Sequence, residues 1–146
     1  MTHLNPLQPE PAFAASSSAE ELWWTFPAVP VHARMARAWL AGWLENRGPG
    51  KDGKAYGALV AFSELVTSCV LRGTGPITVF ARLAEHHLLC EITDRSVEMP
   101  ALLDSTDERK KYQKLSLVDA LTEDWSVRAA PGGGKTLSFT VELDAD

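Results

Sequence analysis

The stretch SELVTSCVLRG, residues 63–73, places an acid and a small hydroxyl four residues apart. The apolar residues Leu65, Val66 and Cys69 recur at helical spacing, which predicts the last turns of an amphipathic helix. Side chains four residues apart lie on one helix face, so Glu64 and Ser68 are expected to project together. An acid and a small hydroxyl held together on a helix otherwise given over to packing are candidate site residues. The plain alternative is a solvated flank beside the apolar stripe.

Length, charge and cysteine content limit the classes of protein to consider. A chain of 146 residues is long enough for one domain with a single core. The net charge of −5 and the pI near 5.3, without a basic stripe, argue against a protein that grips nucleic acid by its phosphates. Cys69 and Cys90 both lie in apolar runs and are interpreted as buried thiols in a reducing compartment.

The sequence carries no sign of export or membrane insertion. No run approaches eighteen uninterrupted apolar residues, and the start, MTHLNPLQPE, lacks a charged segment followed by an apolar one. We therefore expect a cytoplasmic protein that does not enter a membrane.

The chain is expected to consist of a flexible N-terminal tail, residues 1–19, and one domain, residues 20–146. Periodicity and turn residues predict, in order, a strand at 21–28, a helix at 31–45, a flexible connection at 46–57, a helix at 58–71, hairpin strands at 76–83 and 87–94, a long polar segment at 94–114, a short helix at 115–123, and strands at 125–130 and 136–143. This order predicts a two-layer α/β (α+β) sandwich, with a mixed sheet and its helices on one face.

Two near-motifs do not carry function. The segment AAPGGGKT, residues 129–136, approaches the phosphate-binding loop G-x-x-x-x-G-K-[ST], but Ala129 replaces the first Gly and a strand follows instead of a helix. It is interpreted as a hairpin turn. His86 and His87 are sequence neighbours near a turn and make a poor metal site, because adjacent strand residues point to opposite faces.

Four phrases in order, SELVT, EITDRS, LVDAL and GGGKTLSF, resemble the histidine-kinase-like ATPase family with the Bergerat fold. The resemblance covers roughly residues 23–143 and is closest to the single-domain branch of anti-sigma-factor serine kinases and related small bacterial regulators. It implies a Bergerat-type sheet and a site for ATP or ADP with Mg²⁺.

The resemblance assigns roles to the pair that opens this section. Glu64 matches the family's candidate general base. Ser68 occupies the position where the family has an Asn that binds Mg²⁺, and a hydroxyl is a weaker and shorter ligand than an amide oxygen. The metal position is therefore degenerate.

Further nucleotide-binding positions follow from the same resemblance. Asp94 matches an Asp that accepts a hydrogen bond from the adenine amino group, and the alternative is that it caps a local turn. Ser96 stands where a glycine or serine usually lets the backbone approach the base, whereas Glu98 replaces a second glycine. Thr136 matches a residue near the adenine, and ordinary strand packing is its alternative role.

The segment before LSLVDAL departs most from the family. Lys111, Tyr112 and Lys114 stand where glycines would let backbone amides wrap the phosphates. Lys114 can instead attract phosphate as a point charge, and a solvated charged lid is the alternative.

The expected function follows from which positions of the family the sequence retains and which it replaces. Apolar positions that define the fold are kept, whereas the Mg²⁺ position and the phosphate-wrapping glycines are not. We expect a regulatory protein with little or no nucleotide turnover, whose partner is a sigma factor, an anti-sigma antagonist or a similar regulator; a homodimer is compatible with the first helix. The alternative is an active ATP-dependent serine/threonine kinase of the same branch.

Overall fold

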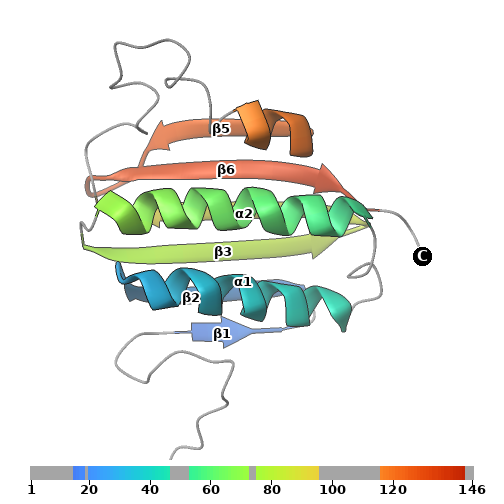
Figure 1. The fold of residues 1–146 in the computed structure, drawn as a ribbon, viewed down its shortest axis with the longest axis horizontal. Helices are drawn as coiled ribbons and strands as arrows, with labels where there is room; N and C mark the ends of the chain where they lie inside the picture. Colours follow the sequence, from blue (N-terminus) through green and yellow to red (C-terminus); the bar gives the residue numbers. More distant parts are fainter. Residues whose placement is uncertain (1–14, 19, 47–52, 73–74, 96–115, 144–146) are drawn as a thin grey trace, which may run out of the picture.

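The computed structural model describes residues 15–18, 20–46, 53–72, 75–95 and 116–143, and these form two layers. One layer is a six-stranded sheet with strand order β1-β2-β3-β4-β6-β5. The other holds two long helices, both on the same face of the sheet and running along its strands (Figure 1). The predicted two-layer sandwich with helices on one face is confirmed.

The elements lie close to the predicted ranges. The strands are β1 (Ala15–Ser17), β2 (Glu21–Pro27), β3 (Pro76–Ala84), β4 (His87–Asp94), β5 (Asp124–Ala129) and β6 (Lys135–Glu142). The helices are α1 (Pro30–Glu45) and α2 (Gly53–Arg72), and residues 116–121 form a short helical segment.

The sheet is antiparallel rather than mixed, which corrects the prediction. All five strand pairs that form it are antiparallel. The reason is the connection between β2 and β3, which contains two helices (Figure 1). A connection with one helix reverses the chain twice and returns it parallel to β2, whereas a connection with two antiparallel helices reverses it three times, so β3 lies beside β2 in the opposite direction.

Local sequence explains where the helices begin. Pro30 opens α1 at a position where its missing N–H costs nothing. The start of α2 was predicted too late: residues 53–57 are helical and not part of the connection. Gly57 lies inside the helix without breaking it, and a Cβ there would lie 3.4 Å from Leu121 Cδ2 of the short helical segment, an ordinary van der Waals distance.

The hairpin turns follow their sequence signals. Glu85 and His86 connect β3 to β4 with φ values of 50° and 69°, the left-handed conformation that a tight two-residue hairpin requires. The turn between β5 and β6 contains three glycines with positive φ, Gly132, Gly133 and Gly134. The interpretation of AAPGGGKT as a hairpin turn is confirmed, since β6 follows it directly.

The core lies between the helices and one face of the sheet. It includes Trp24 and Phe26 of β2, Leu40 of α1, Phe62 of α2 and Phe139 of β6, all 2% exposed or less. Cys69 and Cys90 are buried thiols that form no disulfide among the described residues, as predicted. Burial raises the pKa of the Cys90 thiol far above its ordinary value, with a smaller contribution from the charge of Glu91.

β1 changes the domain boundary. Residues 15–17 were placed in the tail, but they pair with residues 22–24 of β2. The indole Nε1–H of Trp43 in α1 donates a hydrogen bond of 2.9 Å to the carbonyl oxygen of Ser18, which joins this edge to the helix layer. Residues 15–18 therefore contact both the sheet and the helix layer.

In the described part of the chain, Gly53–Leu71 of α2 is long and apolar enough to cross a membrane by length and composition. A core helix passes the same test, and 50% of that stretch is buried inside the protein.

Candidate functional site

The helix α2 holds Glu64 and Ser68 on one flank, as the spacing predicted. Both side chains are half-buried, whereas Leu65, Val66 and Cys69 beside them are buried against the sheet. The pair therefore lies at the border of the packed side of α2. Within the described residues, no three His, Cys, Asp or Glu side chains come together as a metal site.

Asp94 ends β4 and points toward the helix layer. The strand alternates buried and half-buried residues, and Asp94 shares the buried parity of Cys90 and Ile92. It is only 2% exposed. A carboxylate at such a position needs partners that replace water, because an uncompensated buried charge is strongly unfavourable.

Lys135 supplies that partner. It is the first residue of β6 and lies directly opposite Asp94 in the antiparallel register. Its Nζ donates to both carboxylate oxygens of Asp94, at 3.0 Å to Oδ1 and 2.8 Å to Oδ2. The two side chains are 4% and 0% exposed, so this ion pair is closed off from solvent.

The glycine turn brings these two strand ends into close contact. Gly134 has φ +84°, and a Cβ there would collide with the carbonyl oxygen of Asp94. Only a glycine satisfies both the left-handed conformation and the close approach without strain. The turn thus places Lys135 beside Asp94, the last residue of β4.

Thr136 lies on the other face of the sheet. Its hydroxyl pairs with that of Thr93 at 2.8 Å, whereas Asp94 and Lys135, their chain neighbours, point toward the helices. The structure therefore places the side chains of Asp94 and Thr136 on opposite faces of the sheet. Ser96, Lys114 and the other positions discussed at 96–114 lie outside the described residues.

Sequence reasoning missed Lys135, although one feature pointed to it. Lys135 shares strand parity with Leu137, Phe139 and Val141, which face the core. A lysine at the buried parity of a core strand requires an acidic partner. Identifying Asp94 as that partner needed the register between β4 and β6, which sequence alone does not provide.

The chemical consequence concerns what Asp94 can still bind. An adenine amino group would have to donate to a carboxylate oxygen already bonded to an ammonium group. Replacing a charged donor by a neutral one in a buried setting loses the stronger hydrogen bond. It would also leave the Lys135 charge buried without Asp94.

No protein-family model matches this chain, and no curated protein sequence matches it either.

Proposed function

We propose that this protein is a regulator that acts by protein–protein interaction, built on a histidine-kinase-like ATPase scaffold whose nucleotide site is degenerate. The observation that carries the proposal is the buried ion pair between Asp94 and Lys135. In the resemblance noted from sequence, Asp94 is the residue that would recognise adenine. Here both of its oxygens are bonded to an internal ammonium group.

Two further observations support the same direction. Ser68 offers a hydroxyl at the proposed metal position, a weaker ligand than the amide oxygen it replaces. Thr136 lies on the opposite sheet face from Asp94 and is bonded to Thr93. These contacts within the chain at Asp94 and Thr136, and the weak ligand at Ser68, support a degenerate site.

The proposed partner is a regulatory protein of the sigma-factor, anti-sigma or antagonist type, in a partner-switching system in the cytoplasm. The competing proposal is an active ATP-dependent serine/threonine kinase with Glu64 as its base. Its support is that Glu64 and Ser68 occupy one flank of α2, as such a site would need.

ATP turnover separates the two proposals. The purified chain is incubated with Mg·ATP, alone and with a candidate antagonist protein, and both ADP formation and protein phosphorylation are measured. We expect the wild type to match Glu64→Ala in both readouts. ADP formation or stoichiometric phosphorylation that disappears in Glu64→Ala would establish the kinase instead.

A further inference from the structure

The two edges of the sheet differ in length. The strand at one edge, β1, has three residues, whereas β5 at the other edge has six. No strand lies beyond β5 in the part of the chain that the structure describes (Figure 1). The outer edge of β5 therefore presents backbone groups to which another strand can bond, unless the side chains of β5 prevent it.

The hairpin between β5 and β6 determines which backbone groups of β5 point outward. Just beyond β5, the N–H of Ala130 donates to the carbonyl oxygen of Gly134 at 3.1 Å. Along an antiparallel pair, residues that exchange hydrogen bonds with the partner alternate with residues that do not. The even-numbered residues of β5 therefore bond β6, whereas the backbone N–H and C=O groups of Trp125 and Val127 point away from it.

The start of β5 agrees with this alternation. The N–H of Glu123 donates to the carbonyl oxygen of Thr140 at 2.9 Å, although Asp124 is the register partner of Thr140. Two residues on one strand thus oppose one residue on the other, as in a β-bulge. The regular outer edge begins after this bulge, at Asp124.

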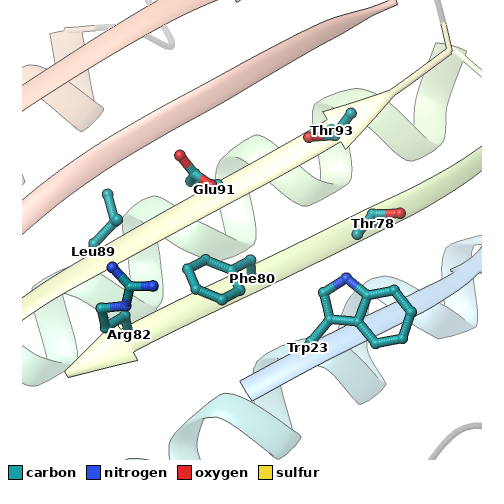
Figure 2. Close-up of a pocket in the computed structure, with 7 residues that line it drawn as sticks. All are labelled: Trp23, Thr78, Phe80, Arg82, Leu89, Glu91 and Thr93. Atoms are coloured by element: carbon teal, nitrogen blue, oxygen red, sulfur yellow. The ribbon is translucent and has the colours of Figure 1, made fainter. Parts of the chain in front are cut away.

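The charged side chains of β5 lie on the open face, which is the face of the sheet away from α1 and α2. No helix lies over this face in the described part of the chain (Figure 1). Figure 2 shows Glu91 projecting from β4 on the open face, and Arg128 donates to Glu91 Oε2 at 2.9 Å. Asp124 shares the strand parity of Arg128 and lies on the same face. Trp125 and Val127 have the opposite parity and pack against the core.

A second copy of β5 fits this edge, because the strand is complementary to itself. In an antiparallel pair of two β5 strands centred on Ser126, each Asp124 faces Arg128 of the other copy. Each Trp125 likewise faces Val127 of the other copy, so their outward backbone groups can exchange hydrogen bonds. Opposite charges and aromatic–β-branched pairs are both favourable cross-strand neighbours.

Other registers of the same pair lose the charge match. Moving the centre to Val127 places Ser126 opposite Arg128, and moving it to Trp125 places Ser126 opposite Asp124. Both registers keep the outward backbone groups aligned, but neither brings an acidic residue opposite Arg128. Charge therefore selects the register centred on Ser126.

Both charged groups can bond a second copy. Asp124 forms no ion pair with another residue that the structure describes. Arg128 contacts Glu91 through Nη2, and a guanidinium carries five N–H donors in all.

We propose that this protein forms a homodimer through its β5 edges, with two antiparallel β5 strands centred on Ser126 joining the sheets of two copies. The interface differs from α1, and the inference does not depend on the proposed function. Because a pair of six-residue strands is smaller than a standard stable interface, we expect a dissociation constant on the order of 0.1 mM.

The mass of the full chain in solution tests the dimer itself. Sedimentation equilibrium from about 10 μM to about 1 mM should show the mass rising from 15.9 kDa toward twice that value. A mass that stays at 15.9 kDa over the whole range overturns the proposal.

Charge reversal tests the register. Asp124→Arg makes arginine face arginine, and Arg128→Asp makes aspartate face aspartate, so each variant alone should dimerise at least about tenfold more weakly. An equimolar mixture restores both opposite-charge pairs and should regain association close to that of the wild type. Glu20→Arg is the matched control, because it makes the same charge change at an exposed position before β2 and should leave the dissociation constant unchanged.

Amide hydrogen exchange locates the interface independently of these variants. The amides of Trp125 and Val127 should exchange more slowly at about 1 mM than at about 10 μM wild-type protein, because the second copy accepts their hydrogen bonds. The amide of Ser126 bonds β6 in either state and should change less.

The proposal is overturned if Asp124→Arg dimerises as well as Glu20→Arg does, which would place the interface elsewhere. It is also overturned if exchange at Trp125 and Val127 is independent of concentration, or if the mixture of folded variants stays monomeric. Circular dichroism checks that each variant is folded; if Arg128→Asp is not, the comparison of Asp124→Arg with Glu20→Arg and the exchange measurement decide. Failure here is distinct from failure of the proposed function, which ATP turnover tests.

Discussion

Each face of the sheet at β4 carries an ion pair, and the two pairs differ in their exposure to solvent. On the helix side, Asp94 and Lys135 form an ion pair whose side chains are 0% and 4% exposed. On the open side, Glu91 pairs with Arg128, and those side chains are 28% and 53% exposed. Water still solvates the second pair, whereas the first is shielded from water.

This difference in exposure determines what each ion pair contributes to stability. An exposed pair contributes little to stability, because solvent screens it and its side chains lose freedom. A buried pair carries a desolvation penalty that its attraction offsets only in good geometry, so it is weak evidence for stability as such. The consequence of the Asp94–Lys135 pair is that both carboxylate oxygens of Asp94 accept hydrogen bonds from Lys135.

The largest expected effect comes from breaking the buried pair. Lys135→Met leaves the Asp94 carboxylate buried without its ammonium partner and should lower the free energy of unfolding by about 3–5 kcal/mol. Urea denaturation at neutral pH measures this. The double variant Lys135→Met/Asp94→Leu removes both charges and should recover most of the loss; if it is as unstable as Lys135→Met, the single variant acts through packing rather than charge.

The glycine turn offers a second test, with a matched control. Gly132 and Gly134 have nearly the same φ, +83° and +84°, but only a Cβ at Gly134 would collide with Asp94, whereas the space around Gly132 is open. Gly132→Ala should destabilise by about 1–2 kcal/mol from backbone strain alone. Gly134→Ala should lose clearly more, about 3 kcal/mol or beyond, by thermal denaturation. Equal losses would mean that this close approach contributes nothing.

The helix side also predicts a pH dependence. Burial lowers the pKa of His32 below its ordinary value of 6.5, and its Nδ1 has no hydrogen-bond partner among the residues that the structure describes. The ring stacks on Phe26 with centroids 5.6 Å apart. The unfolded chain therefore binds this proton more readily than the folded one, so the stability that neutral His32 contributes is full above pH 6.5 and is lost as pH falls below it.

Melting temperature measured from about pH 7.5 to 5.5 checks this. His32→Leu keeps an apolar contact without a titrating group, so its melting temperature should fall less over the same range. An identical pH profile for both proteins would contradict the assignment to His32.

The smallest effect belongs to the open face. Glu21→Gln removes the charge that pairs with Arg82, and both side chains are about half exposed, 46% and 52%. We expect a loss of about 0–1 kcal/mol in unfolding free energy by urea denaturation. A loss comparable to that of Lys135→Met would show that the two faces do not differ as described.

Sequence reasoning identified the elements better than their connections. Alternation predicted β3 and β4, and the turn between them, because local pattern determines both. The start of α2 was missed because Gly53 and Gly57 look like breakers, whereas Gly57 lies against Leu121. That contact is invisible before the chain folds.

The candidate site was also predicted only where local sequence patterns determine it. The helical period placed Glu64 and Ser68 together, and the structure agrees. Strand parity alone puts neighbouring Lys135 and Thr136 on opposite faces, but pairing Asp94 with Lys135 depends on a register between strands about 40 residues apart. Long-range register is set by packing of the whole sheet, so sequence left the role of Asp94 open.

The most direct test of the account is the effect of Mg·ADP on the melting temperature. An intact site with a dissociation constant of about 10 μM would stabilise the fold by about 2.7 kcal/mol at millimolar nucleotide, a shift of roughly 5–15 °C. Because Lys135 already occupies the Asp94 carboxylate, we predict a shift below about 2 °C, and the same small shift in Asp94→Asn relative to its own ligand-free baseline. A shift of several degrees in the wild type that disappears in Asp94→Asn would contradict the account and show that adenine binds.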